Sequence, residues 1–309
     1  MAESRQHRPY FTMVVTALQV ATLIAGFILN WKWTGSVIET NPFNYLIGPS
    51  SGVLIAMGAR FLPCIRGHSV FETSLVACTE GLMPVANPSF VGSVQVCSLA
   101  DYCAPYSGGG NQWYRFFMAM FLHGGVLHFI MNMAFQLRSG WALEREYGWW
   151  RYGAIYLTSG IGGFIFGGLF AGDMSVSVGC SGALYGLNAC LVLDLIQNWG
   201  LIRRPKLELF KMTLSVIFSF VLGTLPYIDN MAHLGGFFTG IFSSLIFAPT
   251  MHFSKWDRRR KRFMTVISMP ILVVIMFFMF YDFYRNTNRC PWCKYINCIP
   301  GMPWCDQKW

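Results

Sequence analysis

The residue best suited to chemistry is a serine between glycines, Ser181, in the string SVGCSGALYG. A serine hydroxyl becomes a nucleophile when a base within hydrogen-bond reach takes its proton. Soluble hydrolases hold such a serine on a sharp strand-to-helix turn. Here an apolar run follows at once, without an alternation of strands and helices. The base must therefore come from elsewhere in the chain.

Two other apolar stretches carry histidine and asparagine. The string HGGVLHFIMN contains His123, His128 and Asn132, and the string DNMAHLGG contains His233. On one helix, Asn132 lies about 40° from His128, so both side chains can point to one site as donors to an oxyanion. His123 would lie about 140° from His128. We expect His123 to make a structural hydrogen bond instead.

The segments that carry these residues are long and apolar. Of the 309 residues, 54% are hydrophobic and 12% are charged, whereas a soluble domain has about a quarter charged residues. About 20 apolar residues cross a hydrocarbon core of ~30 Å. A large soluble helical protein is therefore a poor alternative, and no β-barrel alternation occurs. We predict an all-α polytopic membrane protein with seven transmembrane helices, at 13–30, 114–137, 152–171, 180–197, 209–226, 231–249 and 264–283.

Basic residues predict the orientation of these helices, because cytoplasmic loops carry an excess of Lys and Arg. Fifteen of the 23 basic residues lie in the N-terminal tail 1–12 and in alternate connections, the last of which is 250–263. The connections 172–179 and 227–230 have none. We expect a cytoplasmic N-terminus and an exoplasmic C-terminus. The net charge of +9 reflects this bias, and no soluble basic face for nucleic acid is predicted.

The cysteines support the same topology. Four lie in the loop 31–113 and four in the tail 284–309, both predicted to be exoplasmic. Even-numbered sets of cysteines in such segments are typical of disulfides. A redox pair in the tail string CPWC, or a zinc site there, remains an alternative. The loop cysteines are Cys64, Cys78, Cys97 and Cys103, and the tail cysteines are Cys290, Cys293, Cys298 and Cys305. Cys180 and Cys190 are expected to be small packing residues.

The first span has one further interpretation. A short basic tail precedes it, as in a cleaved signal peptide. Its apolar run is long for a signal peptide and no convincing small-x-small cleavage site follows, so we expect a signal anchor. Either way, the loop 31–113 is exoplasmic.

The predicted topology brings Ser181 and His233 together. The second, fourth and sixth spans run from outside to inside, so both residues lie near the first turn of their helices at similar depth. Gly236 and Gly240 share the helix face of His233, and Gly182 adjoins Ser181. Small residues let membrane helices approach closely. If these faces meet, the imidazole reaches the serine.

Three features are expected to support the pair. The backbone N–H of Ser181, at a helix N-terminus, would donate to an oxyanion. Gly179 opens this helix at the outer membrane edge. Tyr185, one turn below Ser181, would support the imidazole of His233.

Two other classes of site use the same residues. A zinc site from His123, His128 and His233 has poor spacing and no accompanying carboxylate or thiolate, so no metal is predicted. A transporter or channel would need polar groups throughout the depth of several helices. Asn188 and Asp194 do lie deeper, but Asp194 is near the cytoplasmic end.

Taken together, these strings resemble the rhomboid family of intramembrane serine proteases. The resemblance covers about 113–250, with HGGVLHFIMN, SVGCSGALYG and NMAHLGGFFTG in the family's order and EREYGWWR after the second span. It implies a Ser181–His233 dyad without a cofactor, and an oxyanion site from His128, Asn132 and the Ser181 amide. It also implies that Glu144 is a structural carboxylate that orders the first loop. The core 114–249 followed by a seventh helix resembles the secretory-pathway type of eukaryotic rhomboids.

The resemblance implies cleavage of transmembrane protein substrates near the exoplasmic ends of their spans, within the bilayer of a Golgi or plasma membrane. The long cysteine-containing loop 31–113 has no counterpart from which a role can be transferred. Asp229, four residues before His233, suggests a triad, but the family uses a dyad and we expect Asp229 to cap its helix. A rhomboid-like pseudoprotease that binds transmembrane clients would lack the serine or the histidine, and both are present.

Overall fold

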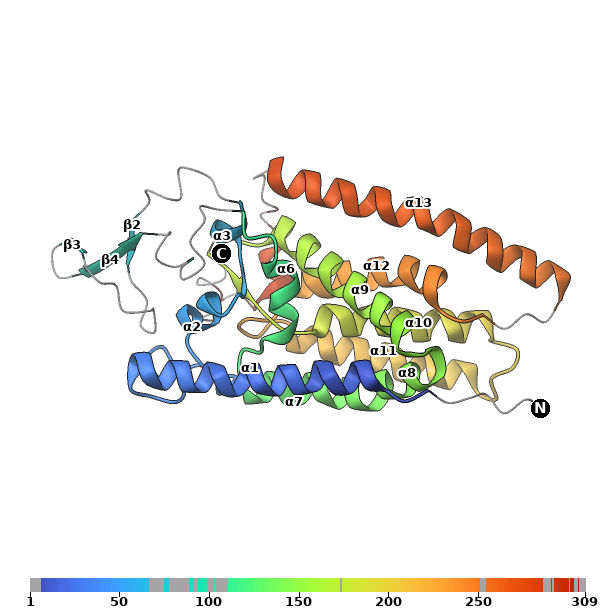
Figure 1. Ribbon diagram of the computed structural model, residues 1–309, viewed down its shortest axis with the longest axis horizontal. Helices are drawn as coiled ribbons and strands as arrows, with labels where there is room; N and C mark the ends of the chain where they lie inside the picture. The colour runs from blue at the N-terminus through green and yellow to red at the C-terminus, as the bar shows by residue number, and fades with distance from the viewer. Residues whose placement is uncertain are drawn as a thin grey trace.

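The protein is a bundle of helices that lie alongside one another (Figure 1). A computed structural model describes residues 7–66, 75–77, 89–91, 94–98, 103, 111–172, 174–250, 254–285, 290, 292–299, 301–302 and 305. Cys78 and the side chain of Cys97 lie outside the described residues. The longest helices are α1 (Tyr10–Thr34), α9 (Trp149–Phe170), α10 (Ser181–Gln197), α11 (Pro205–Leu222), α12 (Asn230–Phe247) and α13 (Lys255–Arg285). Helix α1 begins and α13 finishes at opposite ends of the bundle (Figure 1).

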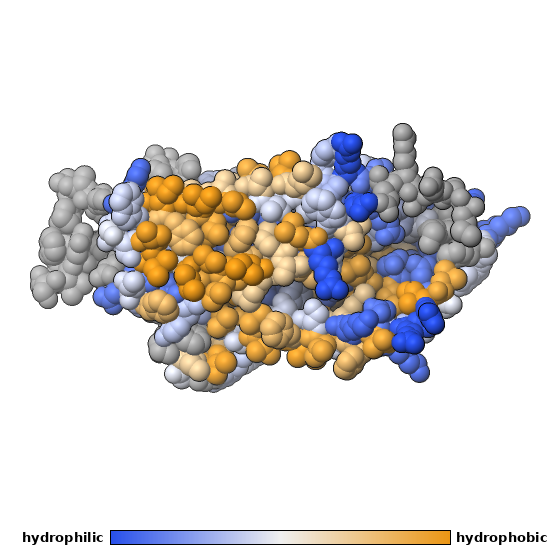
Figure 2. Space-filling model, turned by 90° about the horizontal axis from the view of Figure 1, so that it is seen from below, coloured by the Kyte–Doolittle hydropathy of each residue, from blue (hydrophilic) through white to orange (hydrophobic). Residues whose placement is uncertain are grey.

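Three of the described helices, α1, α9 and α13, are long and apolar enough to cross a membrane. Figure 2 shows apolar side chains over the middle of one face, with hydrophilic side chains gathered toward its ends. Exposed apolar side chains of α1 and α11 include Met13, Leu18, Ile24, Leu214 and Phe218. A protein surface that faces water rarely exposes so many apolar side chains, whereas a surface that faces lipid does.

The predicted second span, 114–137, is not one continuous helix. The chain forms α6 (Arg115–Met118) and a 3₁₀ turn η1 (Ala119–Phe121), bends by 89°, and only then enters α7 (Val126–Phe135). The backbone N–H groups of Val126 and Leu127 donate to the carbonyls of Ile47 and Leu46, at 3.0 and 3.2 Å. Carbonyls of the loop 31–113 thus accept the hydrogen bonds of the first N–H groups of α7. In an unbroken helix, carbonyls one turn earlier in the same helix would accept them. A π-helical turn η2 (Gln136–Gly140) and α8 (Trp141–Tyr147) continue α7.

The segment 250–263, predicted as a loop, also differs, because its residues from Lys255 onward form the first turns of α13. The predicted span 209–226 corresponds to α11, which begins four residues earlier with a proline in its first turn. Proline suits this position because the first helical N–H has no partner.

The loop 31–113 contains short elements rather than irregular chain alone. These are α2 (Ser51–Ala56), β1 (Arg60–Phe61), α3 (Leu62–Arg66), β2 (Leu75–Ala77), β3 (Ser89–Val91) and β4 (Val94–Ser98). Strands β2, β4 and β3 form one antiparallel sheet, and β1 pairs with β5 (Val176–Ser177), opposing Arg60 to Ser177. The loop is thereby attached to the segment that leads into Ser181.

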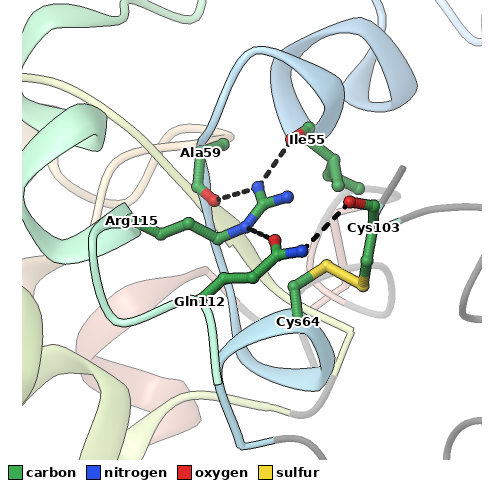
Figure 3. Close-up of a disulfide and its surroundings, with 6 residues drawn as sticks. All are labelled: Ile55, Ala59, Cys64, Cys103, Gln112 and Arg115. Carbon is green, nitrogen blue, oxygen red and sulfur yellow. Dashed lines mark hydrogen bonds between the residues drawn. A yellow bond between two sulfur atoms is a disulfide. The ribbon is translucent and has the colours of Figure 1, made fainter. Parts of the chain in front are cut away.

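A buried arginine organises the part of this loop nearest the bundle (Figure 3). Arg115 Nη1 donates to the carbonyls of Ile55 and Ala59 at 2.6 and 3.0 Å, and its Nε donates to Gln112 Oε1 at 2.6 Å. Gln112 in turn donates to the carbonyl oxygen of Cys103, which forms a disulfide with Cys64. Buried charge needs such partners, so this arginine holds the described part of the loop around Ile55 and Ala59 against the start of α6.

Candidate active site

Ser181 and His233 lie within hydrogen-bond reach of each other. His233 Nε2 is 2.8 Å from Ser181 Oγ, across 52 residues of sequence. Ser181 is the first residue of α10 and His233 lies in the first turn of α12. The pair has the geometry that a serine nucleophile and its base require.

Close approach of the two backbones makes this contact possible. A Cβ at Gly236 would overlap the carbonyl oxygen of Gly182, and a Cβ at Gly240 would overlap the backbone of Gly186. Any larger residue at these positions would push α12 away from α10. The glycines named from the sequence thus lie at the line of contact between the two helices.

The second nitrogen of the imidazole faces an asparagine. His233 Nδ1 is 3.1 Å from Asn230 Oδ1. The amide nitrogen of Asn230 donates to the carbonyls of Phe220 and Ile296, at 2.9 and 2.8 Å. Because carbonyls only accept, the amide oxygen must be the atom that faces His233, and Nδ1 must carry the proton. Nε2 is then left with a lone pair directed at the hydroxyl of Ser181.

Tyr185 packs flat against the imidazole, with ring centroids 4.3 Å apart and an interplanar angle of 10°. Tyr185 lies one turn below Ser181 on α10, and its hydroxyl is 3.4 Å from the carbonyl oxygen of Val216 on α11. The stacked ring limits rotation of the imidazole about its χ angles.

His128 and Asn132 lie beside the entry to α10. Both are buried on α7. A Cβ at Gly179 would lie 2.7 Å from His128 Cε1, 2.9 Å from His128 Nε2 and 3.4 Å from Asn132 Nδ2. Gly179 has φ +117°, which only glycine adopts readily. Asn132 Nδ2 is buried without a hydrogen-bond partner in the described part of the chain. A donor so placed is available to an oxygen of a bound molecule.

His123 does not lie on the helix of His128, because α7 begins only at Val126. The two residues are therefore not separated by 140° around one helix, as expected from the sequence. The rings contact edge to face with centroids 5.3 Å apart, and His123 Nε2 is 3.8 Å from Cys180 Sγ. Cys180 and Cys190 are buried free thiols. His123 thus packs against His128 and Cys180.

The N-terminus of α12 is capped by Asp229, whose carboxylate accepts from the N–H groups of Met231 and Ala232 at 2.9 and 3.2 Å. Its other oxygen forms an ion pair with Arg60 at 2.7 Å, and both side chains are buried. Both oxygens of the Asp229 carboxylate are thus engaged at the start of α12. Asp229 therefore caps α12, as expected from the sequence.

The connection between α11 and α12 covers the bend before α7. The ring of Tyr227 lies over Gly124, and the carbonyl oxygen of Tyr227 accepts from Val178 N at 3.3 Å. Burial, with a smaller contribution from the charge of Glu39, raises the pKa of Tyr227 to about 12. Its hydroxyl is therefore neutral at physiological pH.

A cavity of about 670 Å³ adjoins the Ser181–His233 pair. It is lined by residues of α7, α10 and α11, including His128, Asn132, Tyr185, Ser219 and Phe218. Its size is that of a site for an extended peptide segment or a drug-sized molecule. No group of three or more His, Cys, Asp or Glu side chains among the described residues is arranged to hold a metal ion.

The chain is similar in sequence to proteins of one known family. Residues 110–250 match the model of the rhomboid domain. The chain is 33% identical to rhomboid-type serine protease 2 of Emericella nidulans, over 96% of this chain and 71% of that protein. This chain belongs to the rhomboid family. It is also 37% identical to inactive rhomboid protein 1 of Homo sapiens and 35% identical to that of Danio rerio, each over 66% of this chain and 24% of the relative.

Membership of the rhomboid family, together with the apolar helices, makes this a multi-pass membrane protein. The predicted disulfides are confirmed for three pairs of this rhomboid, Cys64–Cys103, Cys290–Cys293 and Cys298–Cys305. The string CPWC is thus closed by a disulfide between its own two cysteines.

The carboxylate of Glu144 in this rhomboid lies at the start of α1. The carboxylate of Glu144 accepts from the backbone N–H groups of Phe11 and Thr12, each at 2.7 Å. It therefore caps the start of α1, and its expected role in ordering the first loop stays a prediction. Free N–H groups at a helix N-terminus attract a carboxylate strongly, but no sequence spacing links residues 132 positions apart.

Sequence reasoning also missed three residues of the rhomboid site. Asn230 stands in the same string as His233, and its polarity at a helix start was the only signal. Arg60 and Asn297 lie in the two cysteine-containing segments, far from the motifs. Nothing in their local sequence indicates that they meet Asp229.

Proposed function

We propose that this rhomboid is an intramembrane serine endopeptidase. The observation that carries the proposal is the 2.8 Å approach of His233 Nε2 to Ser181 Oγ, with the imidazole proton held on Nδ1 by Asn230. The relative named a serine protease supports it, since the alignment covers nearly the whole chain.

The mechanism follows from these atoms. His233 Nε2 takes the proton of Ser181 as Oγ attacks the carbonyl carbon of a peptide bond. The carbonyl oxygen becomes an oxyanion, to which Asn132 Nδ2, His128 and the Ser181 N–H donate. Collapse of this intermediate breaks the C–N bond, and His233 gives its proton to the leaving amine. Water then hydrolyses the acyl-enzyme with His233 again as base.

The substrate class follows from the position of the cavity. It is bounded by α11, none of whose residues is buried, and its lining is largely apolar. The proposed substrates are transmembrane segments of other proteins, extended locally where the scissile bond meets Ser181. Residues that weaken a helix near the exoplasmic end of such a segment would favour cleavage.

The proposed location is a secretory membrane, Golgi or plasma membrane, with a cytoplasmic N-terminus, seven crossings and an exoplasmic C-terminus. The excess of basic residues in alternate connections supports this orientation. Disulfides in the loop 31–113 and in the tail support it independently, because they persist in oxidising compartments.

The test is co-expression with a type I membrane protein that has small residues at the outer end of its span. We expect cleavage near that end, abolished by Ser181→Ala and by His233→Ala. Equal cleavage by wild type and Ser181→Ala would overturn the proposal. A serine-reactive fluorophosphonate should label wild type and not Ser181→Ala.

The second candidate is a rhomboid that binds transmembrane clients and controls their trafficking or degradation without cleaving them. Relatives named inactive rhomboid proteins support it, since they match two thirds of this chain. This candidate requires client binding by wild type and Ser181→Ala alike, with no cleavage by either.

A further inference from the structure

A short helix of the cysteine-rich tail lies on the N-terminus of α12. This helix, α14 (Lys294–Asn297), stands between the disulfides Cys290–Cys293 and Cys298–Cys305. Cys293 and Cys298, the cysteines on either side of it, are both buried. A helix of four residues is unstable by itself, so the disulfides and the contacts with α12 hold it in place.

Asn297 supplies a cap to α12 from outside that helix. Its Oδ1 accepts from the backbone N–H groups of Asn230 and Met231 at 2.8 and 3.3 Å, and its Nδ2 donates to Asp229 Oδ1 at 3.1 Å. The first N–H groups of a helix have no partner within it. Asn297 is only 5% exposed, so removing it would leave the N–H of Asn230 without this acceptor and without ready access to water.

The same tail orients the side chain of Asn230. One of the two carbonyls that receive its amide protons belongs to Ile296, next to Asn297 in α14. The other belongs to Phe220, near the end of α11. A Cβ at Gly223 would overlap Asn230 Oδ1, so the space that holds this amide is closely bounded. The tail therefore determines which atom of Asn230 faces His233.

We propose that Asn297, held by the two tail disulfides, is a positioning residue for the dyad. It fixes the start of α12 and, with the Ile296 carbonyl, the amide of Asn230, which keeps the proton of His233 on Nδ1 and the lone pair on Nε2. The proposal deepens the proposed protease function and rests on it. Asn297 touches no reacting atom and acts only through Asn230 and His233.

The test compares the full chain with Asn297→Ala, purified in detergent micelles. The rate at which a fluorophosphonate labels Ser181 is measured, together with kcat, KM and the unfolding temperature. Misplacement of a catalytic group by about 1 Å costs on the order of 10²-fold in rate. We expect the labelling rate and kcat to fall by this order while KM stays unchanged, because the cavity is not altered.

The matched control is Ile299→Ala. Ile299 lies two residues after Asn297, inside the loop closed by Cys298–Cys305, but is 46% exposed. The Ile299→Ala variant should have the labelling rate and the kcat of the wild type. A second variant, Cys298→Ser with Cys305→Ser, keeps Asn297 and removes the disulfide that directly follows it. It should slow labelling in the same direction, which keeps the proposal testable if Asn297→Ala fails to fold.

A third measurement does not depend on activity. The ¹⁵N spectrum of the His233 ring distinguishes the two neutral tautomers, and wild type should show the proton on Nδ1. Wild-type labelling and an unchanged ring spectrum in Asn297→Ala would overturn the positioning role and leave the protease intact. Equal labelling of wild type and Ser181→Ala would instead overturn the protease function, and the ring spectrum would still decide whether the tail positions His233.

Discussion

Helices α12 and α11 both border the cavity, but they are held in different ways. Ten of the residues of α12 are buried, and its N-terminus is bonded to β1 through Arg60 and to α14 through Asn297. Helix α11 has no buried residue, and its one ion pair, Lys211–Glu208, is exposed. The helix that carries His233 is packed on several sides, whereas no residue of α11 is buried. The proposed function, in which a fixed base acts on a transmembrane segment that must be admitted, needs both properties.

The largest expected effect is on the free energy of unfolding when the ion pair of α12 is broken, compared with the ion pair of α11. Arg60→Met leaves Asp229 buried without its charge partner, and loss of one member of a buried pair costs about 3–5 kcal/mol. Lys211→Met on α11 removes an exposed pair, for which about 0–1 kcal/mol is usual. Unfolding of each variant in mixed micelles measures the free energies. Equal losses would contradict the contrast between the helices, and Asp229→Asn added to Arg60→Met should recover part of the loss.

The next largest effect is expected on kcat, with no loss of stability. Asn132→Ala removes a buried donor that has no protein partner in the described part of the chain. Loss of one oxyanion donor lowers kcat by about 10²–10³-fold. The unfolding temperature should stay the same or rise. Asn188→Ala, which changes an asparagine deeper in the same cavity, serves as the control and should retain its kcat. Equal kcat for Asn132→Ala and wild type would exclude Asn132 from the oxyanion site.

A smaller effect tests the contact between α10 and α12. Gly236→Ala places a methyl group against the carbonyl of Gly182, and such overpacking costs about 1–3 kcal/mol. Activity should fall with it, since His233 moves away from Ser181. Gly200→Ala has open space around the new methyl group and should leave the free energy of unfolding unchanged or slightly higher. Thermal unfolding of the two variants side by side gives the comparison.

The smallest effect on stability is expected on α11. Phe218 lines the cavity and is 64% exposed, so Phe218→Ala should change the free energy of unfolding by less than about 0.5 kcal/mol. If α11 contacts the substrate, KM rises while kcat is unchanged. A large loss of stability in this variant would show that α11 is packed as firmly as α12.

Much of the site could be predicted from residues close together in sequence. Ser181, His233 and the glycines beside them stand at helix starts, and the direction of the spans brings those starts to one end of the bundle. The relation of His128 to Asn132 also holds, because both lie on α7 after its first residue. The break before that helix was not predicted, because the loop carbonyls at residues 46 and 47 satisfy its first N–H groups. Such long-range bonds leave no periodic signal.

By itself the sequence determined the membrane class and the helical fold, and it predicted the nucleophile and base of the proposed protease, because hydrophobic length and motif spacing are local properties. Only the tertiary structure decided what orients the base. Asn230 selects the tautomer of His233 because two carbonyls, one of them 66 residues away, take its amide protons. Arg60 and Asn297 hold the same helix start from segments whose local sequence indicates no such contact. Hydrogen bonds between distant segments depend on packing, and packing exists only once the chain has folded.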